Sequence, residues 1–183
     1  MTNGREIELK FRIHGWTLDK LYYDILQQPF IKLERALATC KTRDYYFPCP
    51  KDLQMLRLRD SYGTDELGFS KQLQELTVKR KDTGSNFNRL ETNVELKSCK
   101  SMYQALELLY GEPYVTIHKD ERVIFTQDGM IISLAIVEDD PDIFLEVEGP
   151  TEDKVNQYVR VLEIWYNMLP ELRSLIEIFG DVN

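Results

Sequence analysis

Glu6-Ile7-Glu8-Leu9-Lys10-Phe11-Arg12 lies within the first dozen residues of the chain, and it alternates charged and apolar side chains without a break. Successive side chains of a β-strand point to opposite faces of a sheet, so this alternation predicts a strand. One face of the strand is apolar, and the other carries two acids and two bases in a row. Such a face is typical either of a solvent-exposed strand or of a wall that holds a cation and an anion side by side.

Length and composition limit what the chain can be. With 183 residues, of which 43% are hydrophobic, we expect one folded domain over residues 1–183 with a core of its own. The formal net charge of −8 argues against a general nucleic-acid coat and against binding to an anionic membrane surface. A local basic pocket inside an acidic shell remains compatible with these numbers.

The start of the chain is polar and charged, and no apolar run approaches the roughly 20 residues of a membrane-spanning helix. The three cysteines are widely spaced and only two histidines are present, so a zinc site is not expected. Any metal would be held by carboxylates, which favours Mg²⁺ or Mn²⁺. We therefore expect a cytoplasmic protein with reduced thiols.

Alternation returns in several later stretches. Leu53 to Arg59 places Met55, Arg57 and Arg59 on one face, and Ile143 to Gly149 places Phe144, Glu146 and Glu148 on one face. Further strands are predicted at Ile31–Tyr46, Leu76–Lys81, Phe87–Leu96, Tyr114–Phe125 and Met130–Val137, with Asp60–Gln74 as a loop or hairpin. Helices are predicted from Thr17 to Pro29, from Ser101 to Tyr110, from Thr151 to Leu169 and within Leu172–Phe179. About eight strands and a few helices result.

The polar faces of these strands carry an unusual set of charges. If the strands close into a barrel, one set of alternating residues lines the interior, and a charged interior requires a ligand because unpaired buried charge is costly. Arginine and lysine match phosphate oxygens, and clustered glutamates hold hard divalent cations that bridge phosphates. The acids are Glu6, Glu8, Glu91, Glu146 and Glu148, and the bases are Lys10, Arg12, Arg57, Arg59, Lys79, Arg89 and Arg122.

These motifs together resemble the CYTH family, also called triphosphate tunnel metalloenzymes. The resemblance rests on five ordered segments that span nearly the whole chain. They are Glu6-x-Glu8-x-Lys10, Asp44-Tyr45-Tyr46-Phe47, Leu56-Arg57-Leu58-Arg59, Leu76-Thr77-Val78-Lys79 with Arg89-x-Glu91, and Phe144-Leu145-Glu146-Val147-Glu148, and Arg122 lies where a KxR strand would be.

The resemblance implies an α+β fold, a closed antiparallel eight-stranded β-barrel that forms a triphosphate tunnel with flanking helices. It implies that Glu6, Glu8, Glu146 and Glu148 carry one or two Mg²⁺ or Mn²⁺ ions, and that Glu91 ligates metal or orients an arginine. Lys10, Arg12, Arg57, Arg59, Lys79, Arg89 and Arg122 would bind the triphosphate, with Lys10, Arg57, Arg59 and Glu91 as the catalytic set. Lys71 and Lys81 compete with Lys79 for the inward position.

Ala135 departs from the family pattern, in which an Asp often stands at this point of the strand before the closing acids. The number of metal ions therefore stays open between one and two. A second departure is Lys119-Asp120-Glu121-Arg122, which is one residue longer than KxR and suggests a bulge or a shifted register.

Three functions fit these residues. The first is metal-dependent hydrolysis of inorganic triphosphate, a nucleoside triphosphate or a similar organic triphosphate. The second is a class IV adenylate cyclase that makes cyclic AMP and pyrophosphate from ATP. The third is a non-catalytic protein that binds nucleotide or polyphosphate, which Ala135 would favour. We expect a small-molecule triphosphate as partner and no membrane. Acidic net charge disfavours a long nucleic acid, and a homodimer stays open.

Overall fold

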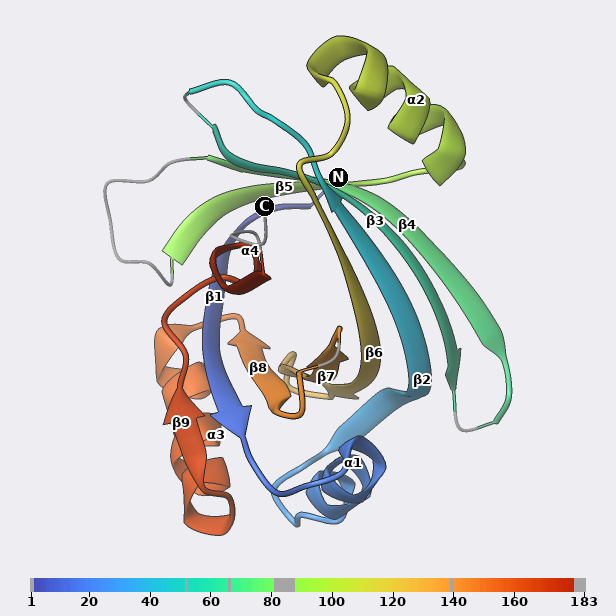
Figure 1. Cartoon of the computed structure of the whole chain (residues 1–183). Coiled ribbons are helices and arrows are strands. Elements are labelled where there is room, and N and C mark those ends of the chain that lie inside the picture. The colour runs from blue at the N-terminus through green and yellow to red at the C-terminus, as the bar shows by residue number, and fades with distance from the viewer. Residues whose placement is uncertain (1, 52, 66, 81–87, 139, 180–183) are drawn as a thin grey trace.

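The alternating stretch near the start of the chain forms most of strand β1 (Thr2–Ile13). The computed structural model describes every residue except 1, 52, 66, 81–87, 139 and 180–183, and only the backbone of residues 2–6 and 88–91. In that described part, nine strands form one antiparallel sheet and four helices pack against it, which makes the fold α+β (Figure 1). The other strands are β2 (Leu33–Tyr46), β3 (Leu53–Asp65), β4 (Ser70–Arg80), β5 (Asn88–Glu95), β6 (Val115–Thr126), β7 (Ile131–Val137), β8 (Ile143–Gly149) and β9 (Met168–Pro170). The helices are α1 (Leu18–Leu26), α2 (Cys99–Tyr110), α3 (Glu152–Trp165) and α4 (Leu175–Phe179).

Strand β1 makes the most pairings in the sheet. The strand order is β5-β4-β3-β2-β6-β7-β8-β1-β9, and β1 also pairs with β5. Residues 2–7 of β1 face β5, residues 7–13 face β8, and residues 11–13 face β9. Strand β1 therefore has three neighbours and each strand from β2 to β8 has two, and the polar faces of distant segments are brought together.

Helices cover the apolar face of the sheet on two sides. Phe11 and Ile13 of β1 belong to one buried cluster with Leu21 of α1 and Leu162 of α3. Helix α2 packs through Leu106 on the apolar face of β3, which contributes Leu56 and Leu58. In Figure 1, α2 lies outside β3 and β4, and α1 and α3 lie at the opposite end of the molecule. No helix within the described ranges is long and apolar enough to cross a membrane.

The opposite face of the sheet is mainly polar, with one apolar cluster at the side where α4 packs. Leu175 of α4 is buried there with Tyr46 of β2, Ala135 of β7 and Phe144 of β8. Helix α4 therefore lies against residues that share the face of Glu146 and Lys10, and it reaches the same space that those charged side chains line.

Local sequence signals set several of these boundaries: Thr17 is a typical N-cap residue, Gly111 a typical helix end, and Asp128-Gly129 a typical hairpin turn. Thr17 caps α1 by accepting a hydrogen bond from the Lys20 amide, and Gly111 ends α2 with a φ of 86°. The Asp128-Gly129 pair turns β6 into β7, with Gly129 at a φ of 84°. Glycine has no Cβ, so it adopts a positive φ without a steric penalty. This explains why a glycine follows α2 and why another lies in the turn between β6 and β7.

The stretch Asp60–Gln74, predicted as a loop or hairpin, is part of the hairpin of β3 and β4. Other boundaries differ from the prediction. Ser98, not Ser101, caps α2. Helix α3 ends at Trp165, and Leu169 lies in β9 next to Pro170, which cannot continue a helix. The composition of Asp82-Thr83-Gly84-Ser85-Asn86 predicts a turn, and these residues lie outside the described part of the chain.

Candidate functional site

Residues of eight strands, β1 to β8, line a cavity of about 280 Å³. Seven residues predicted from the sequence meet there: Glu8, Lys10, Arg57, Arg59, Lys79, Glu146 and Glu148. The wall also contains four residues that sequence reasoning did not select, namely Glu75, Asn93, Lys119 and Glu121. Acids and bases from opposite ends of the chain thus share one enclosed space.

Asp44 organises the basic side of this cavity. Its carboxylate is fully buried and accepts two hydrogen bonds from Arg59, from Nε at 2.7 Å and from Nη2 at 2.8 Å. Lys119 Nζ lies 2.9 Å from the same carboxylate. Burial alone would raise the pKa of Asp44, but the charges of Arg59 and Lys119 outweigh it and hold that pKa well below its usual value. Two cations are therefore fixed in place by one carboxylate.

Arg57 and Lys79 extend the basic wall onto β3 and β4. Arg57 Nη2 donates to Thr77 Oγ1 at 2.9 Å and lies 3.8 Å from Glu75 Oε1. Lys79 is buried and lines the cavity, whereas Lys71 is exposed near the far end of β4 and Lys81 lies outside the described residues. Lys79 is therefore the lysine of this strand that reaches the cavity.

The acidic side comes from β1 and β8, whose register sets two pairs of residues directly opposite each other. Lys10 faces Glu146, with Lys10 Nζ 2.9 Å from Glu146 Oε1, and Glu8 faces Glu148. Burial opposes ionisation of Glu146, but the charges of Lys10 and Lys119 lower its pKa to about 2. One carboxylate thus serves as an ion-pair partner of Lys10, and two others, Glu8 and Glu148, meet as like charges.

The Glu8–Glu148 pair is the donor set that fits a divalent cation. Mg²⁺ is usually held by one or two carboxylates, with water and substrate phosphates in the remaining positions, and two carboxylates in direct register meet that requirement. Within the described side chains no group of three or more His, Cys, Asp or Glu residues forms a complete metal site. The side chains of Glu6 and Glu91, both predicted near the metal, lie outside those described. The described carboxylates could therefore supply two ligands of a divalent ion, with its other ligands coming from elsewhere.

Glu6, Arg89 and Glu91 can be placed only by their backbone. Glu6 pairs in register with Arg89 between β1 and β5, and Glu91 pairs with Lys79 between β4 and β5. Ala135 is buried in the apolar cluster with α4, and its partner on β6 is Glu121, a cavity residue. The carboxylate nearest to Ala135 in the register of these two strands is thus supplied by β6.

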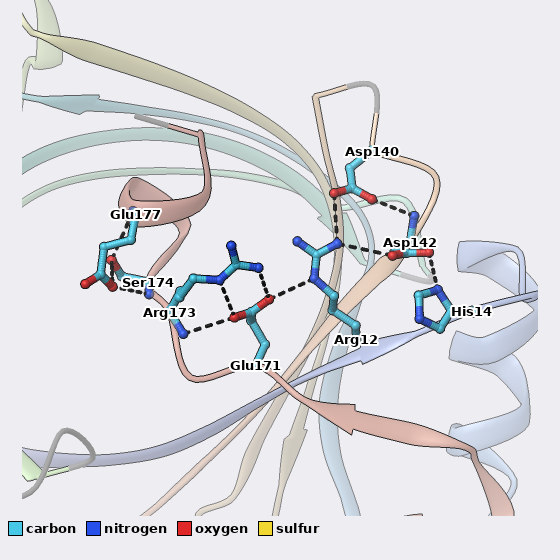
Figure 2. Close-up of polar contacts among 8 residues, drawn as sticks. All are labelled: Arg12, His14, Asp140, Asp142, Glu171, Arg173, Ser174 and Glu177. Atoms are coloured by element: carbon cyan, nitrogen blue, oxygen red, sulfur yellow. Dashed lines mark hydrogen bonds and ion pairs between the residues drawn. The ribbon is translucent and has the colours of Figure 1, made fainter. Parts of the chain in front are cut away.

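Arg12 does not line the cavity, contrary to the prediction. Its guanidinium binds three carboxylates, with Nε 2.9 Å from Glu171 and Nη1 3.1 Å from both Asp140 and Asp142 (Figure 2). It also lies 4.6 Å from the centre of the Phe144 ring. Through these contacts, the Arg12 side chain belongs to a structural cluster that joins β1 to the loop before β8 and to the segment after β9.

Arg122 is a second correction. Its Nη2 lies 2.8 Å from Asp19 at the start of α1, and its Nη1 lies 2.8 Å from Asp120. Side chains alternate along β6, so Arg122 shares the outward face with Asp120, while Lys119 and Glu121 face the cavity. Lys119, rather than Arg122, is the cation that β6 supplies.

The cluster around Arg12 continues into the C-terminal segment. Glu171 also binds Arg173 at 3.0 Å, and its amide donates to the Lys10 carbonyl at 2.9 Å. Ser174 and Glu177 then bond to each other at the start of α4 (Figure 2). Because Ser174, Leu175 and Ile176 line the cavity, this chain of contacts fixes one part of its wall.

A larger hollow of about 540 Å³ lies on the outer face of β2, β3 and β6. Its lining includes Lys41, Arg43 and His118, which are all exposed, and it is more open to solvent than the inner cavity. Charges held in fixed positions by buried partners gather in the inner cavity instead. We therefore assign the functional site to the inner cavity.

Three residues of the site to which the sequence analysis gave no role carried a signal that could have identified them. Lys119 and Glu121 stand two and four residues after Ile117, so all three point to the same face of β6. Asp44 belongs to the motif Asp44-Tyr45-Tyr46-Phe47, but the sequence analysis gave it no role. Glu75 lies between the stretch predicted as a loop or hairpin and the strand predicted from Leu76, so no strand face was assigned to it. Asn93 was aligned with its neighbours on β5 but carries no charge, and charge was the selection criterion.

Comparison with known proteins agrees with this geometry. The chain matches the CYTH domain family over residues 4–176. No curated protein matches the sequence. Among solved structures, the PH1012 protein from Pyrococcus horikoshii OT3 superposes with a TM-score of 0.68 at 18% identity, covering 95% of this chain and 99% of that one.

Two further structures share the fold. A candidate adenylate cyclase from Vibrio parahaemolyticus has a TM-score of 0.67 at 18% identity, with 97% of this chain and 98% of that chain covered. A candidate adenylyl cyclase from Hippeastrum, described as having a dominant triphosphatase activity, has a TM-score of 0.59 at 15% identity, with 95% and 94% covered. At such identities these likenesses show the fold alone. The match over residues 4–176 spans nearly the whole chain, which therefore belongs to the CYTH domain family.

Proposed function

We propose that this protein binds a small triphosphate-containing molecule in the inner cavity, together with Mg²⁺ or Mn²⁺, and hydrolyses it. The observation that carries the proposal is the division of the cavity into two sides. Arg57, Arg59, Lys79 and Lys119 supply fixed positive charge on one side, and Glu8 and Glu148 meet on the other. The pairing of β1 with β5 supports a tunnel in which eight strands surround this space.

The basic residues would bind the phosphate oxygens. Arg59 uses Nε and Nη2 to contact Asp44, which leaves Nη1 as the nitrogen that can meet a phosphate oxygen. Since Asp44 already fixes Arg59 and Lys119, little reorganisation is needed as charge develops on the transferring phosphoryl group. Positioning and electrostatic stabilisation account for most of the catalysis in phosphoryl transfer, and fixed cations supply both.

Glu8 and Glu148 would hold the divalent ion on the opposite side. When bound, such an ion neutralises phosphate charge and orients the reacting group. Lys10 stays in its ion pair with Glu146, where burial disfavours its charge but Glu146 and Glu8 raise its pKa. Lys10 therefore remains protonated and adds a further cation beside the acidic pair. In hydrolysis, a water oxygen adds to the terminal phosphorus and the bridging oxygen leaves.

Cyclisation of ATP is the second candidate, because two structures with this fold are described as candidate cyclases. Hydrolysis and cyclisation differ in products. The test is a panel of tripolyphosphate, ATP and thiamine triphosphate with Mg²⁺ or Mn²⁺, in which phosphate, pyrophosphate and cyclic AMP are measured for the wild type and for Glu8→Gln.

We expect metal-dependent phosphate release from at least one substrate and a loss of about 100-fold in Glu8→Gln, the size typical of removing one transition-state contact. Glu163→Gln, which neutralises an exposed acid on α3, is the matched control. If cyclic AMP and pyrophosphate appear instead of phosphate, the activity is cyclisation and not hydrolysis. If a substrate binds tightly but no product forms, the protein is a binding protein and both proposed activities are wrong.

A further inference from the structure

Asn93 contributes a neutral side-chain amide to the wall of the cavity. The Oδ1 atom is buried, yet it accepts no hydrogen bond from any part of the chain that the structure describes. Buried polar atoms in folded proteins are nearly always hydrogen-bonded, so an exception calls for a physical explanation. A missing ligand is one such explanation, because Asn93 lines the cavity.

The neighbours of Asn93 place this oxygen beside the phosphate-binding wall. The register sets Tyr46, Arg57, Thr77 and Asn93 side by side across β2, β3, β4 and β5. Arg57 donates to Thr77, and the Thr77 hydroxyl donates onward to Glu75 at 3.2 Å. Both of these bonds end on Thr77 and Glu75. Asn93, which pairs with Thr77 on one side and with Thr2 of β1 on the other, receives neither of them.

The cavity also has an apolar part that inorganic phosphate does not need. Met55 of β3, Ile131 of β7 and two residues of α4, Leu175 and Ile176, line it together with the charged side chains. Phosphate oxygens gain nothing from contact with such groups, whereas a carbon-containing substituent does. The wall therefore combines a phosphate-binding region with surface suited to an organic group.

Hydrogen-bond chemistry decides which part of a ligand meets Asn93. An ionised triphosphate offers only acceptor oxygens, which cannot satisfy another acceptor. A hydroxyl or amino group on an organic substituent can donate. We propose that Asn93 is a specificity-determining residue, whose Oδ1 accepts a hydrogen bond from a donor on the organic part of a triphosphate ester while α4 packs against that part.

This inference rests on the proposed function and narrows its substrate class to organic triphosphates that carry a donor group. A site built to hydrogen-bond such a donor disfavours ligands that lack it, because its polar atom is then left unpaired. Tripolyphosphate, which has no organic part, would therefore bind less well than an ester with hydroxyl groups.

Binding measured by calorimetry at mildly alkaline pH tests the inference, with three probes: tripolyphosphate, methyl triphosphate and ATP. Methyl triphosphate is an ester without donors, so it separates the organic group from its hydrogen bonds. In the wild type we expect ATP to bind about 10-fold tighter than methyl triphosphate, as for one well-formed hydrogen bond to a buried group.

Asn93→Leu removes the acceptor at similar volume, and we expect the ratio of ATP to methyl triphosphate affinity to fall about 10-fold towards unity. Asn93→Asp keeps the acceptor oxygen, so it should retain the ratio even though its charge weakens both ligands. Asn156→Leu, on α3 and outside the cavity, is the control. Circular dichroism and thermal melting confirm that each variant is folded.

Equal weakening of all three ligands in Asn93→Leu would overturn the inference, because Asn93 would then contact phosphate or act only through the fold. An unchanged ratio would overturn it as well. Absence of binding for every probe in the wild type is a different result, which contradicts the proposed function itself.

Discussion

The same cavity holds carboxylates in two opposite situations. Asp44 is surrounded by cations, with Arg59 and Lys119 both within 2.9 Å of it. Glu8 and Glu148 instead face each other across the β1–β8 pairing, where like charges repel. The first arrangement is complete without a ligand and fixes its partners. In the second, a bound cation would offset the repulsion, so the account places the divalent ion on that side and phosphate on the side that Asp44 holds in place.

The comparison predicts opposite effects on stability when each carboxylate is neutralised. Asp44→Asn should show the largest loss, because it leaves two buried cations without their counter-charge. Breaking a buried pair in this way typically lowers the free energy of unfolding by about 3–5 kcal/mol. Urea denaturation measures this loss, and the exposed Glu163→Gln should stay within about 0.5 kcal/mol of the wild type. A loss no larger than that of the control would show that Asp44 is not the organising group.

Arg12 offers the reverse arrangement, one cation among three carboxylates, and sharpens the comparison. Arg12→Met should lower the free energy of unfolding by about 2 kcal/mol, the scale of charged hydrogen bonds. Tripolyphosphate affinity should be unchanged, because Arg12 lies outside the cavity wall. Calorimetry and urea denaturation on the same variant test both statements. Weakened phosphate binding with intact stability would instead restore the sequence-based prediction for Arg12.

Glu146 predicts a pH dependence. Its pKa is lowered from 4.5 to about 2 in the folded protein, so the ionised carboxylate stabilises the fold above pH 4.5, and this contribution disappears as pH falls through 2. Glu146→Gln should therefore be less stable than the wild type at neutral pH, and the difference should shrink between those two values. Urea denaturation at a series of pH values measures it. A difference that stays constant into acid would contradict the Lys10–Glu146 ion pair.

The smallest effect is expected on the acidic side. Glu148→Gln removes a like-charge contact, so in metal-free buffer the free energy of unfolding should rise by about 0.5 kcal/mol. Thermal melting in the presence of a chelator measures this gain. A clear loss of stability in Glu148→Gln would mean that this carboxylate, like Asp44, serves a structural role.

Much of the fold followed from local pattern. Strict alternation marked β1 and β8, and their inward residues were identified correctly because every second side chain of those strands is apolar. The N-cap at Thr17 and the turn at Asp128-Gly129 depend only on adjacent residues, so the sequence indicates both of them. Such signals depend on a few adjacent residues, and the chain supplies them directly.

The site was harder to read where charge fills both faces of a strand. Residues 119–122 are all charged, so no apolar residue within this run shows which of them face inward. Arg122 was therefore selected instead of Lys119. The partners of Arg12 lie 128 or more residues away in the sequence, and no local pattern reports such contacts. Asn93 was not selected because it carries no charge, and its buried amide oxygen without a partner is visible only in the assembled wall.

The central claim is that phosphate binds on the basic side and a divalent ion on the side of Glu8 and Glu148. Calorimetric titration of tripolyphosphate with and without Mn²⁺ tests it most directly, in the wild type and in the Glu8→Gln, Glu148→Gln double variant. In the wild type Mn²⁺ should raise the tripolyphosphate affinity by about 10-fold, a typical coupling between two adjacent ligands, and the double variant should lose that gain. A gain of the same size in the double variant would contradict the account.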